Sequence, residues 1–165
     1  MTKARVAILI SGTGSNMAAL IYASRAATCP YEVVLVTGDR PDAPGLTLAE
    51  AEGIPIVRLP FDRATFFAQL DRTLREADVD TVALAGFMRI LPADFVQAWQ
   101  GKLLNIHPSL LPKYRGLHTH QRALEAGDSH GGCSVHLVTP EVDAGEVLGQ
   151  VPVAILPQDT PETLA

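Results

Sequence analysis

Short runs of apolar residues, alternating with stretches of mixed polarity, constrain the fold of this chain most strongly. In the first half each run is nearly continuous in apolar residues, as in strands buried on both faces of a parallel sheet. Helices are predicted between the runs, at about 15–27, 44–52 and 63–76. This alternation predicts right-handed βαβ units and an α/β fold with an open, doubly wound, mostly parallel sheet. The runs are RVAILI (5–10), YEVVLVT (31–37), IPIVRL (54–59) and TVALAGF (81–87).

The second half of the chain is less regular. A short helix around 92–99 precedes the predicted strand KLLNI (102–106), and HTHQRALEAGD (118–128) is typical of a helix. Two further strand candidates, CSVHLVT (133–139) and VLGQVPVAI (147–155), are joined by a short connection. Since so short a connection is typical of a hairpin, we expect antiparallel strands in this C-terminal part.

The last residues, DTPETLA, have the signature of a helix that begins. Asp159 or Thr160 can cap it, Pro161 suits its first turn and Glu162 adds an acidic residue there. The sequence stops at Ala165, so we expect the final helix to be missing. The length of 165 residues suits one domain. We therefore expect residues 1–165 to form a single domain that is incomplete at its C-terminus.

Composition narrows the classes of partner. The formal net charge is −5 and no run of Lys or Arg occurs, which argues against nucleic acid or an anionic membrane as the main partner. Cys29 and Cys133 lie far apart without a zinc-binding pattern, so we expect reduced thiols in a cytoplasmic protein. No stretch approaches the roughly 18 apolar residues that would span a bilayer.

The first run leads into the glycine-rich loop of ISGTGSNMAAL, and a predicted helix follows. Glycines allow a sharp turn, and free N–H groups at a helix N-terminus attract an anion. The loop lacks the lysine of a Walker A motif, and Met17 replaces the third glycine of the dinucleotide motif. It can bind a phosphate or be a tight turn without a ligand. A dinucleotide stays possible because Asp39 follows the second strand.

A second candidate ligand segment is LAGFMRILP (84–92), at the carboxyl end of the fourth apolar run. Ligands of open α/β sheets bind outside these strand ends. The segment can line a pocket for a flat heterocycle, or it can be an ordinary connection from a strand to a helix.

The segment LLNIHPSLLPKYRGLHTH (103–120) offers the strongest candidate for catalysis. Residues two apart on a strand face the same side, so Asn105 and His107 are expected to project together. An amide can donate to a developing oxyanion, and an imidazole can transfer a proton near neutral pH. His107 can equally be a structural residue. His118 and His120 suggest a metal site only weakly, because no third ligand stands in register.

Asp143, in PEVDAGEV, is by itself typical of an ordinary turn. It becomes functional only if the fold returns it to His107, where an ionised carboxylate would favour the protonated imidazole. We expect His136, within a predicted strand, to be a hydrogen-bonded core residue.

Four segments, in this order, together resemble the phosphoribosylglycinamide formyltransferases, the folate-dependent formyltransferase family of purine synthesis. The HPSLLP core is shared with other formyl-folate enzymes, including methionyl-tRNA formyltransferase, whereas GLHTH and SGTGSN point to the glycinamide branch. The resemblance runs from about residue 5 to the end of the chain. The segments are ISGTGSN, LAGFMRIL, LLNIHPSLLPKYRGLHTH and SVHLVTPEVDAG.

The resemblance implies transfer of the formyl group of the co-substrate 10-formyltetrahydrofolate to the glycyl amine of glycinamide ribonucleotide, without a metal. It implies a monomer or homodimer with small-molecule partners and no nucleic-acid or membrane partner. It also implies that the missing helix supplies nucleotide contacts, so that this form binds nucleotide poorly. The alternatives are a formyltransferase acting on another amine, such as methionyl-tRNA, and a non-catalytic phosphate- or nucleotide-binding module.

The resemblance also assigns roles to residues of this sequence. The catalytic positions are Asn105, His107 and Asp143. The positions that bind the substrate phosphate are Gly14, Ser15 and Asn16. The positions that bind the folate are Arg63, Met88, Arg89, Ile90, Leu91 and Asn105.

Overall fold

The structure is a computed structural model that describes residues 2–165. The chain divides into two compact units, the first ending at Leu103 and the second spanning Leu104–Ala165. The expectation of one domain over residues 1–165 stays a prediction. No helix within residues 2–165 is long and apolar enough to cross a membrane.

The first unit is a parallel α/β layer structure. Its strands pair in the order β3-β2-β1-β4, and each neighbouring pair is parallel. This arrangement confirms the doubly wound, parallel part of the predicted fold. The elements are β1 (Ala4–Ile10), α1 (Ser15–Ser24), β2 (Tyr31–Gly38), α2 (Pro44–Ala51), β3 (Ile56–Arg58), α3 (Phe66–Glu76), β4 (Thr81–Leu84) and α4 (Ala93–Ala98).

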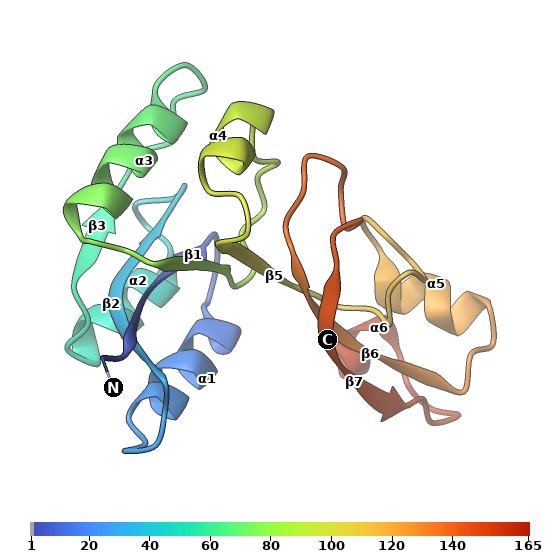
Figure 1. Ribbon diagram of the computed structural model, residues 1–165. Helices are drawn as coiled ribbons and strands as arrows, with labels where there is room; N and C mark the ends of the chain where they lie inside the picture. Colours follow the sequence, from blue (N-terminus) through green and yellow to red (C-terminus); the bar gives the residue numbers. More distant parts are fainter. Residues whose placement is uncertain (1) are drawn as a thin grey trace. The chain divides into compact units, whose positions relative to one another are not determined.

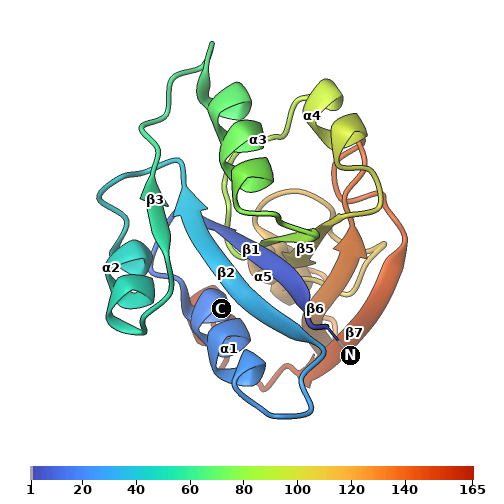
Figure 2. The same ribbon diagram turned by 60° about the vertical axis from the view of Figure 1, so that its left-hand side comes forward.

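Helices cover both faces of this sheet: α1 and α2 lie on one face, α3 and α4 on the other (Figures 1 and 2). Successive side chains of β1 point to opposite faces, so the strand is buried on both. Ile8 and Ile10 pack in one core with Met17 and Ile21 of α1. On the other face, the centres of the Phe66 and Phe87 rings lie 6.3 Å apart. Burial on both faces explains the continuous apolar runs of the sequence.

The ends of some elements differ from the prediction. β4 stops at Leu84 rather than at residue 87, because Gly86 has φ 78° and turns the chain out of the sheet. Helix α3 begins at Phe66 rather than near residue 63, because the Asp62 side chain accepts hydrogen bonds from the backbone N–H groups of Ala64 and Thr65. Local side-chain hydrogen bonds of this kind compete with the helix.

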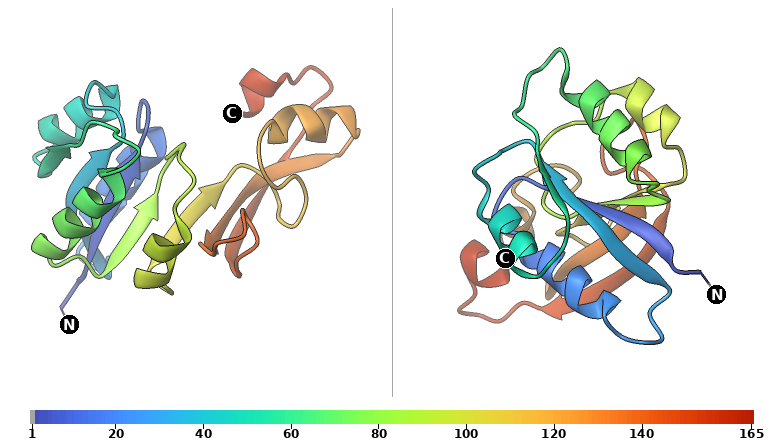
Figure 3. Two further views of the ribbon diagram at one scale, coloured as in Figure 1. Left: turned by 90° about the horizontal axis from the view of Figure 1, so that it is seen from above. Right: turned by 90° about the vertical axis from the view of Figure 1, so that its left-hand side faces the viewer.

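The second unit is built on antiparallel strands, which confirms the prediction for the C-terminal part. β5 pairs with β6, and β6 pairs with β7. The left view of Figure 3 shows α5 and α6 beside each other on one side of the β6–β7 pair. The elements are β5 (Leu103–His107), which begins at the last residue of the first unit, α5 (Thr119–Glu125), β6 (His130–Leu137), β7 (Val147–Ala154) and α6 (Pro161–Leu164).

The helix start predicted at the end of the sequence is present as α6. The Thr160 side chain accepts a hydrogen bond from the Thr163 N–H, and the Thr163 hydroxyl accepts one from the Thr160 N–H. This reciprocal pair is a capping box, and it satisfies two N–H groups that the first helical turn leaves free.

Candidate functional site

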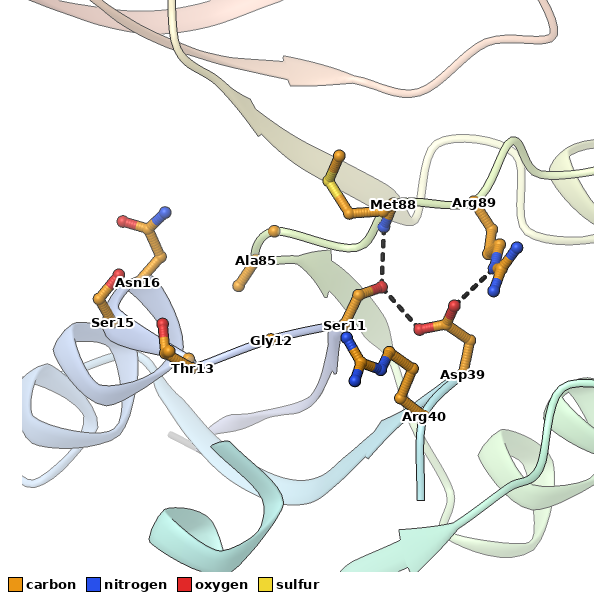
Figure 4. A pocket seen from close by; sticks show the side chains of 12 residues that line it. Ser11, Gly12, Thr13, Ser15, Asn16, Asp39, Arg40, Ala85, Met88 and Arg89 are labelled. Carbon is orange, nitrogen blue, oxygen red and sulfur yellow. Dashed lines mark hydrogen bonds and ion pairs between the residues drawn. The ribbon is translucent and has the colours of Figure 1, made fainter. Parts of the chain in front are cut away.

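The glycine-rich loop of the first unit borders a pocket of about 500 Å³ (Figure 4). Gly14 has φ 79° and forms the N-cap of α1, so the loop turns sharply just before the helix. No side chain among the described residues caps this end of α1. The first N–H groups of the helix therefore remain available to an anion. The pocket is lined by residues 11–16, Asp39, Arg40, Ala85, Gly86, Met88 and Arg89.

A second glycine, Gly45, contacts the loop through its backbone. The N–H of Gly45, in the first turn of α2, donates to the Gly12 carbonyl at 3.1 Å. A Cβ at position 45 would lie 2.5 Å from Cδ1 of Ile10 and 3.1 Å from the Thr13 carbonyl oxygen. Only a glycine therefore allows α2 to approach the loop this closely.

Asp39 lines the pocket but is almost fully buried, and both of its carboxylate oxygens accept hydrogen bonds. Oδ1 accepts a hydrogen bond of 2.6 Å from the Ser11 hydroxyl, and Oδ2 accepts one of 2.5 Å from Nε of Arg89. The Ser11 hydroxyl in turn accepts from the N–H of Met88 (Figure 4). Asp39 thus ties the loop to the segment after β4. This engagement argues against the dinucleotide interpretation, in which the acid at this position binds a ribose.

The predicted ligand residues of the first unit fall into two groups. Gly14, Ser15, Asn16, Met88 and Arg89 line the same pocket. The other three do not line it: Ile90 is 78% exposed, Leu91 is buried, and Arg63 is exposed in the turn before α3.

The second unit brings the predicted catalytic residues together. Asn105 and His107 stand two apart on β5 and face the same side, as the alternation of a strand requires. In the antiparallel register Asn105 is opposite His136 and His107 is opposite Ser134. His107 is 5% exposed. The imidazole is therefore held in a largely water-free position beside the amide.

The fold returns Asp143 to His107. Its Oδ2 lies 3.3 Å from Nδ1 of His107 and accepts a hydrogen bond of 2.9 Å from the N–H of Gly116. Its Oδ1 lies 3.5 Å from Nε2 of His136. The other nitrogen of His107, Nε2, lies 2.9 Å from the Tyr114 carbonyl oxygen. Both nitrogens of His107 thus face oxygen acceptors, and the two can donate at the same time only when the imidazole carries both protons.

His136 is the site residue whose role the sequence did not reveal. It is buried and hydrogen-bonded, as expected of a core residue, but it also contacts Asn105 and Asp143. Its Nδ1–H donates to the Leu137 carbonyl at 2.9 Å, so Nε2 accepts from the Asn105 amide at 3.1 Å. The register of the predicted antiparallel strands could have revealed this role, because it puts His136 opposite Asn105.

The two histidines of GLHTH lie at the start of α5. His118 is the N-cap of α5, with φ 57°. His120 is partly buried, and burial lowers the pKa of its imidazole. Within residues 2–165 no group of three or more His, Cys, Asp or Glu side chains is arranged to hold a metal ion.

Comparison with known proteins identifies the family. The sequence profile of the family described as "Formyl transferase" matches residues 4–165. The chain is 43% identical to phosphoribosylglycinamide formyltransferase of Haemophilus influenzae over 164 residues, covering 96% of this chain and 76% of that protein. It is 49% identical to trifunctional purine biosynthetic protein adenosine-3 of Drosophila melanogaster, covering 97% of this chain but only 12% of that protein.

The fold gives the same result. The crystal structure of phosphoribosylglycinamide formyltransferase from Brucella melitensis matches with a TM-score of 0.94 and 46% identity, covering 99% of this chain and 86% of that chain. A match of this extent in both sequence and fold is far above what a shared α/β architecture alone produces. The chain belongs to the formyl transferase family.

Proposed function

We propose that the chain transfers the formyl group of 10-formyltetrahydrofolate to the glycyl amine of glycinamide ribonucleotide, in purine biosynthesis. The observation that carries this proposal is the grouping of Asn105 and Asp143 around the buried imidazoles of His107 and His136 in the second unit. The names of the relatives support the same substrates. We propose that residues 1–165 act as one catalytic domain.

The proposed reaction exchanges one bond to the formyl carbon for another. The substrate amine attacks this carbon and gives a tetrahedral intermediate with a negatively charged oxygen. The bond from the carbon to the folate nitrogen then breaks, and the proton lost by the amine ends on that nitrogen. No oxidation or reduction occurs, so the protein has to stabilise the oxyanion and move one proton.

In this proposal Asn105 stabilises the oxyanion. An amide nitrogen carries two hydrogens, and His136 accepts one of them. The other is free to donate to the formyl oxygen as negative charge develops there. His136 thereby fixes the direction of the Asn105 amide.

In this proposal His107 moves the proton. Its Nε2 lies 2.9 Å from the Tyr114 carbonyl and its Nδ1 3.3 Å from Asp143, so we propose that the more weakly held Nδ1 proton is the one that is transferred. Nδ1 faces Asp143, whose Oδ2 orients the ring from a distance of 3.3 Å. When the imidazole carries both protons, it adds a positive charge close to the oxyanion.

The first unit supplies the candidate binding groups. We propose that the N-terminus of α1, with Gly14, Ser15 and Asn16, binds the phosphate of the nucleotide. The folate ring would lie against the segment from Met88 to Leu91, where Met88 and Ile90 expose apolar side chains. Arg63, exposed before α3, would contact the folate.

The partners are small molecules in this proposal, and the protein acts in the cytoplasm as a monomer or homodimer. A net charge of −5 disfavours the alternative acceptor, methionyl-tRNA, because RNA binding requires concentrated positive charge. The contacts of Asn105, His107 and Asp143 disfavour a purely binding module, in which these three groups would have no role.

The test is formyl transfer followed by absorbance, with a 10-formyl folate analogue as donor. We expect turnover with glycinamide ribonucleotide and none with methionyl-tRNA at equal concentration. Turnover with the tRNA alone would replace the proposed acceptor. Absence of turnover with both acceptors, by protein that binds the folate analogue, would refute formyl transfer.

A further inference from the structure

The segment Lys113–Gly116, here called the clamp segment, contacts both members of the His107–Asp143 pair through its backbone. The Tyr114 carbonyl lies 2.9 Å from Nε2 of His107, and the Gly116 N–H donates to Oδ2 of Asp143 at 2.9 Å. The position of this short segment therefore sets where the imidazole and the carboxylate stand relative to each other.

The backbone of the clamp segment is unusual. Tyr114 has φ 56° and Gly116 has φ 81°. Glycine adopts this left-handed region freely, but a bulky aromatic residue rarely does. Tyr114 therefore stays in this conformation only because other contacts hold it there. One of them is the Ser109 hydroxyl, which donates to the Lys113 carbonyl at 2.6 Å.

The side chains of the clamp segment are anchored on Asp128, which follows α5. The Tyr114 hydroxyl donates to Oδ2 of Asp128 at 2.7 Å, and Nζ of Lys113 lies 3.0 Å from both carboxylate oxygens. The guanidinium of Arg122 lies 5.2 Å from the centre of the Tyr114 ring. The hydrogen bond from Tyr114 is the largest cause that lowers the pKa of Asp128, and Lys113 lowers it further. This anchor is therefore a bond to an ionised group, which is stronger than a neutral hydrogen bond.

We propose that Tyr114 and Asp128 are positioning residues for His107: the bond between phenol and carboxylate holds Tyr114, and the Tyr114 carbonyl fixes Nε2 of the imidazole. The proposal rests on the proposed function, in which His107 moves a proton through Nδ1. Neither residue touches the substrate in this role. Without the anchor, Tyr114 relaxes towards ordinary backbone angles, and the imidazole loses the acceptor that fixes its orientation.

The experiment compares variants of the full chain. Tyr114→Phe removes the hydroxyl and keeps the ring against Arg122, whereas Asp128→Ala removes the acceptor. Asp128→Asn keeps an oxygen that can accept from the phenol, so it is the conservative rescue. Glu76→Gln is the matched control, because Glu76 is an exposed carboxylate of α3 paired with Arg72 at 2.7 Å. Thermal unfolding of each variant shows that it is folded.

We expect kcat to fall about tenfold in Tyr114→Phe and in Asp128→Ala, with KM for both substrates within about twofold, because a mispositioned group impairs the reaction rather than binding. The double variant should be no slower than the slower single variant, since both changes break one contact. Asp128→Asn should recover most of the rate, and Glu76→Gln should match the wild type.

A second readout does not depend on activity. In the ¹⁵N spectrum of the histidine rings, assigned with a His107→Gln variant, Nε2 of His107 should be protonated in the wild type and change in Tyr114→Phe. A wild-type protein that does not transfer formyl groups would refute the proposed function. The spectral test would then still decide whether Tyr114 positions His107. Wild-type kcat in Tyr114→Phe together with unchanged His107 signals would overturn the positioning role. A lower melting temperature of this variant without a change in kcat or in the His107 signals would overturn it as well.

Discussion

Gly145 allows a direct test of how closely Asp143 must be placed. It stands two residues after Asp143, in the connection between β6 and β7. A Cβ built at this position would lie 1.7 Å from the Leu137 carbonyl oxygen and 2.8 Å from the carbonyl carbon. Both atoms are backbone, and the neighbouring Leu137 N–H donates to Glu146 at 2.9 Å. The steric clash in Gly145→Ala therefore cannot be relieved by the rotation of a side chain.

The size of the effect follows from the distance that the backbone must move. Real Cβ atoms essentially never come closer than 3.0 Å to such an atom, so the connection has to shift by more than about 1 Å from its present 1.7 Å contact. Asp143 moves with the connection. Its Oδ2 lies only 3.3 Å from Nδ1 of His107, so a shift of this size breaks that contact. Misplacement of a catalytic group by about 1 Å costs about 10²-fold in rate. We therefore expect kcat of Gly145→Ala to fall about 10²-fold.

The assay is steady-state formyl transfer, with thermal unfolding as the check on folding. Gly149→Ala is the matched control, because a Cβ at Gly149 on β7 meets no atom within 4 Å. Its kcat should equal that of the wild type. A Gly145→Ala protein that is folded and keeps kcat within about threefold of the wild type would show that Asp143 tolerates this displacement, against the argument from geometry.

Four further substitutions test other parts of the structure. His107→Ala and Asn105→Ala should each lower kcat by about 10²-fold or more, as loss of an oxyanion donor does, and near-wild-type rates in both would refute the mechanism. Gly45→Ala should push the loop before α1 and raise KM for the nucleotide more than it lowers kcat; an unchanged KM would contradict phosphate binding there. The hydrogen bond from Arg75 is the largest cause that lowers the pKa of Asp71. The stability that this carboxylate contributes is present above its unfolded pKa of about 3.9 and is lost as pH falls through the lower folded value. The urea midpoint of unfolding should therefore differ less between about pH 6 and about pH 2 in Asp71→Asn than in the wild type. The same difference in both proteins would contradict this prediction.

The sequence predicted those features that depend on local periodicity. The apolar runs located the parallel strands because both faces of β1 are buried, and Ile8 and Ile10 alternate with residues of the opposite core. Asn105 and His107 were placed on one face by the same alternation. Element ends were less predictable, because β4 stops at Leu84 through a positive φ at Gly86 that an apolar pattern does not indicate.

Contacts between distant segments could be expected only as alternatives. Asp143 was either a turn residue or the partner of His107, and the return of the connection after β6 decides between them. Asp39 followed the second strand as a dinucleotide-binding acid would, but Ser11 and Arg89 occupy its two oxygens. The identity of an acidic residue does not show which neighbours the fold will bring to it.

The part of the site that the sequence could not reveal is the part made by backbone atoms. A carbonyl and an N–H are present at nearly every position, so nothing in the letters KYRG marks Tyr114 as the acceptor for His107 or Gly116 as the donor to Asp143. Their directions are set by left-handed backbone angles, and at Tyr114 that angle is held by a side chain that points away to Asp128. In Tyr114, therefore, the side chain supplies the anchor and the backbone supplies the contact with the imidazole. A substitution at Asp128, remote in sequence from the three proposed catalytic residues, should consequently affect the reaction, whereas the removal of an exposed carboxylate elsewhere should not.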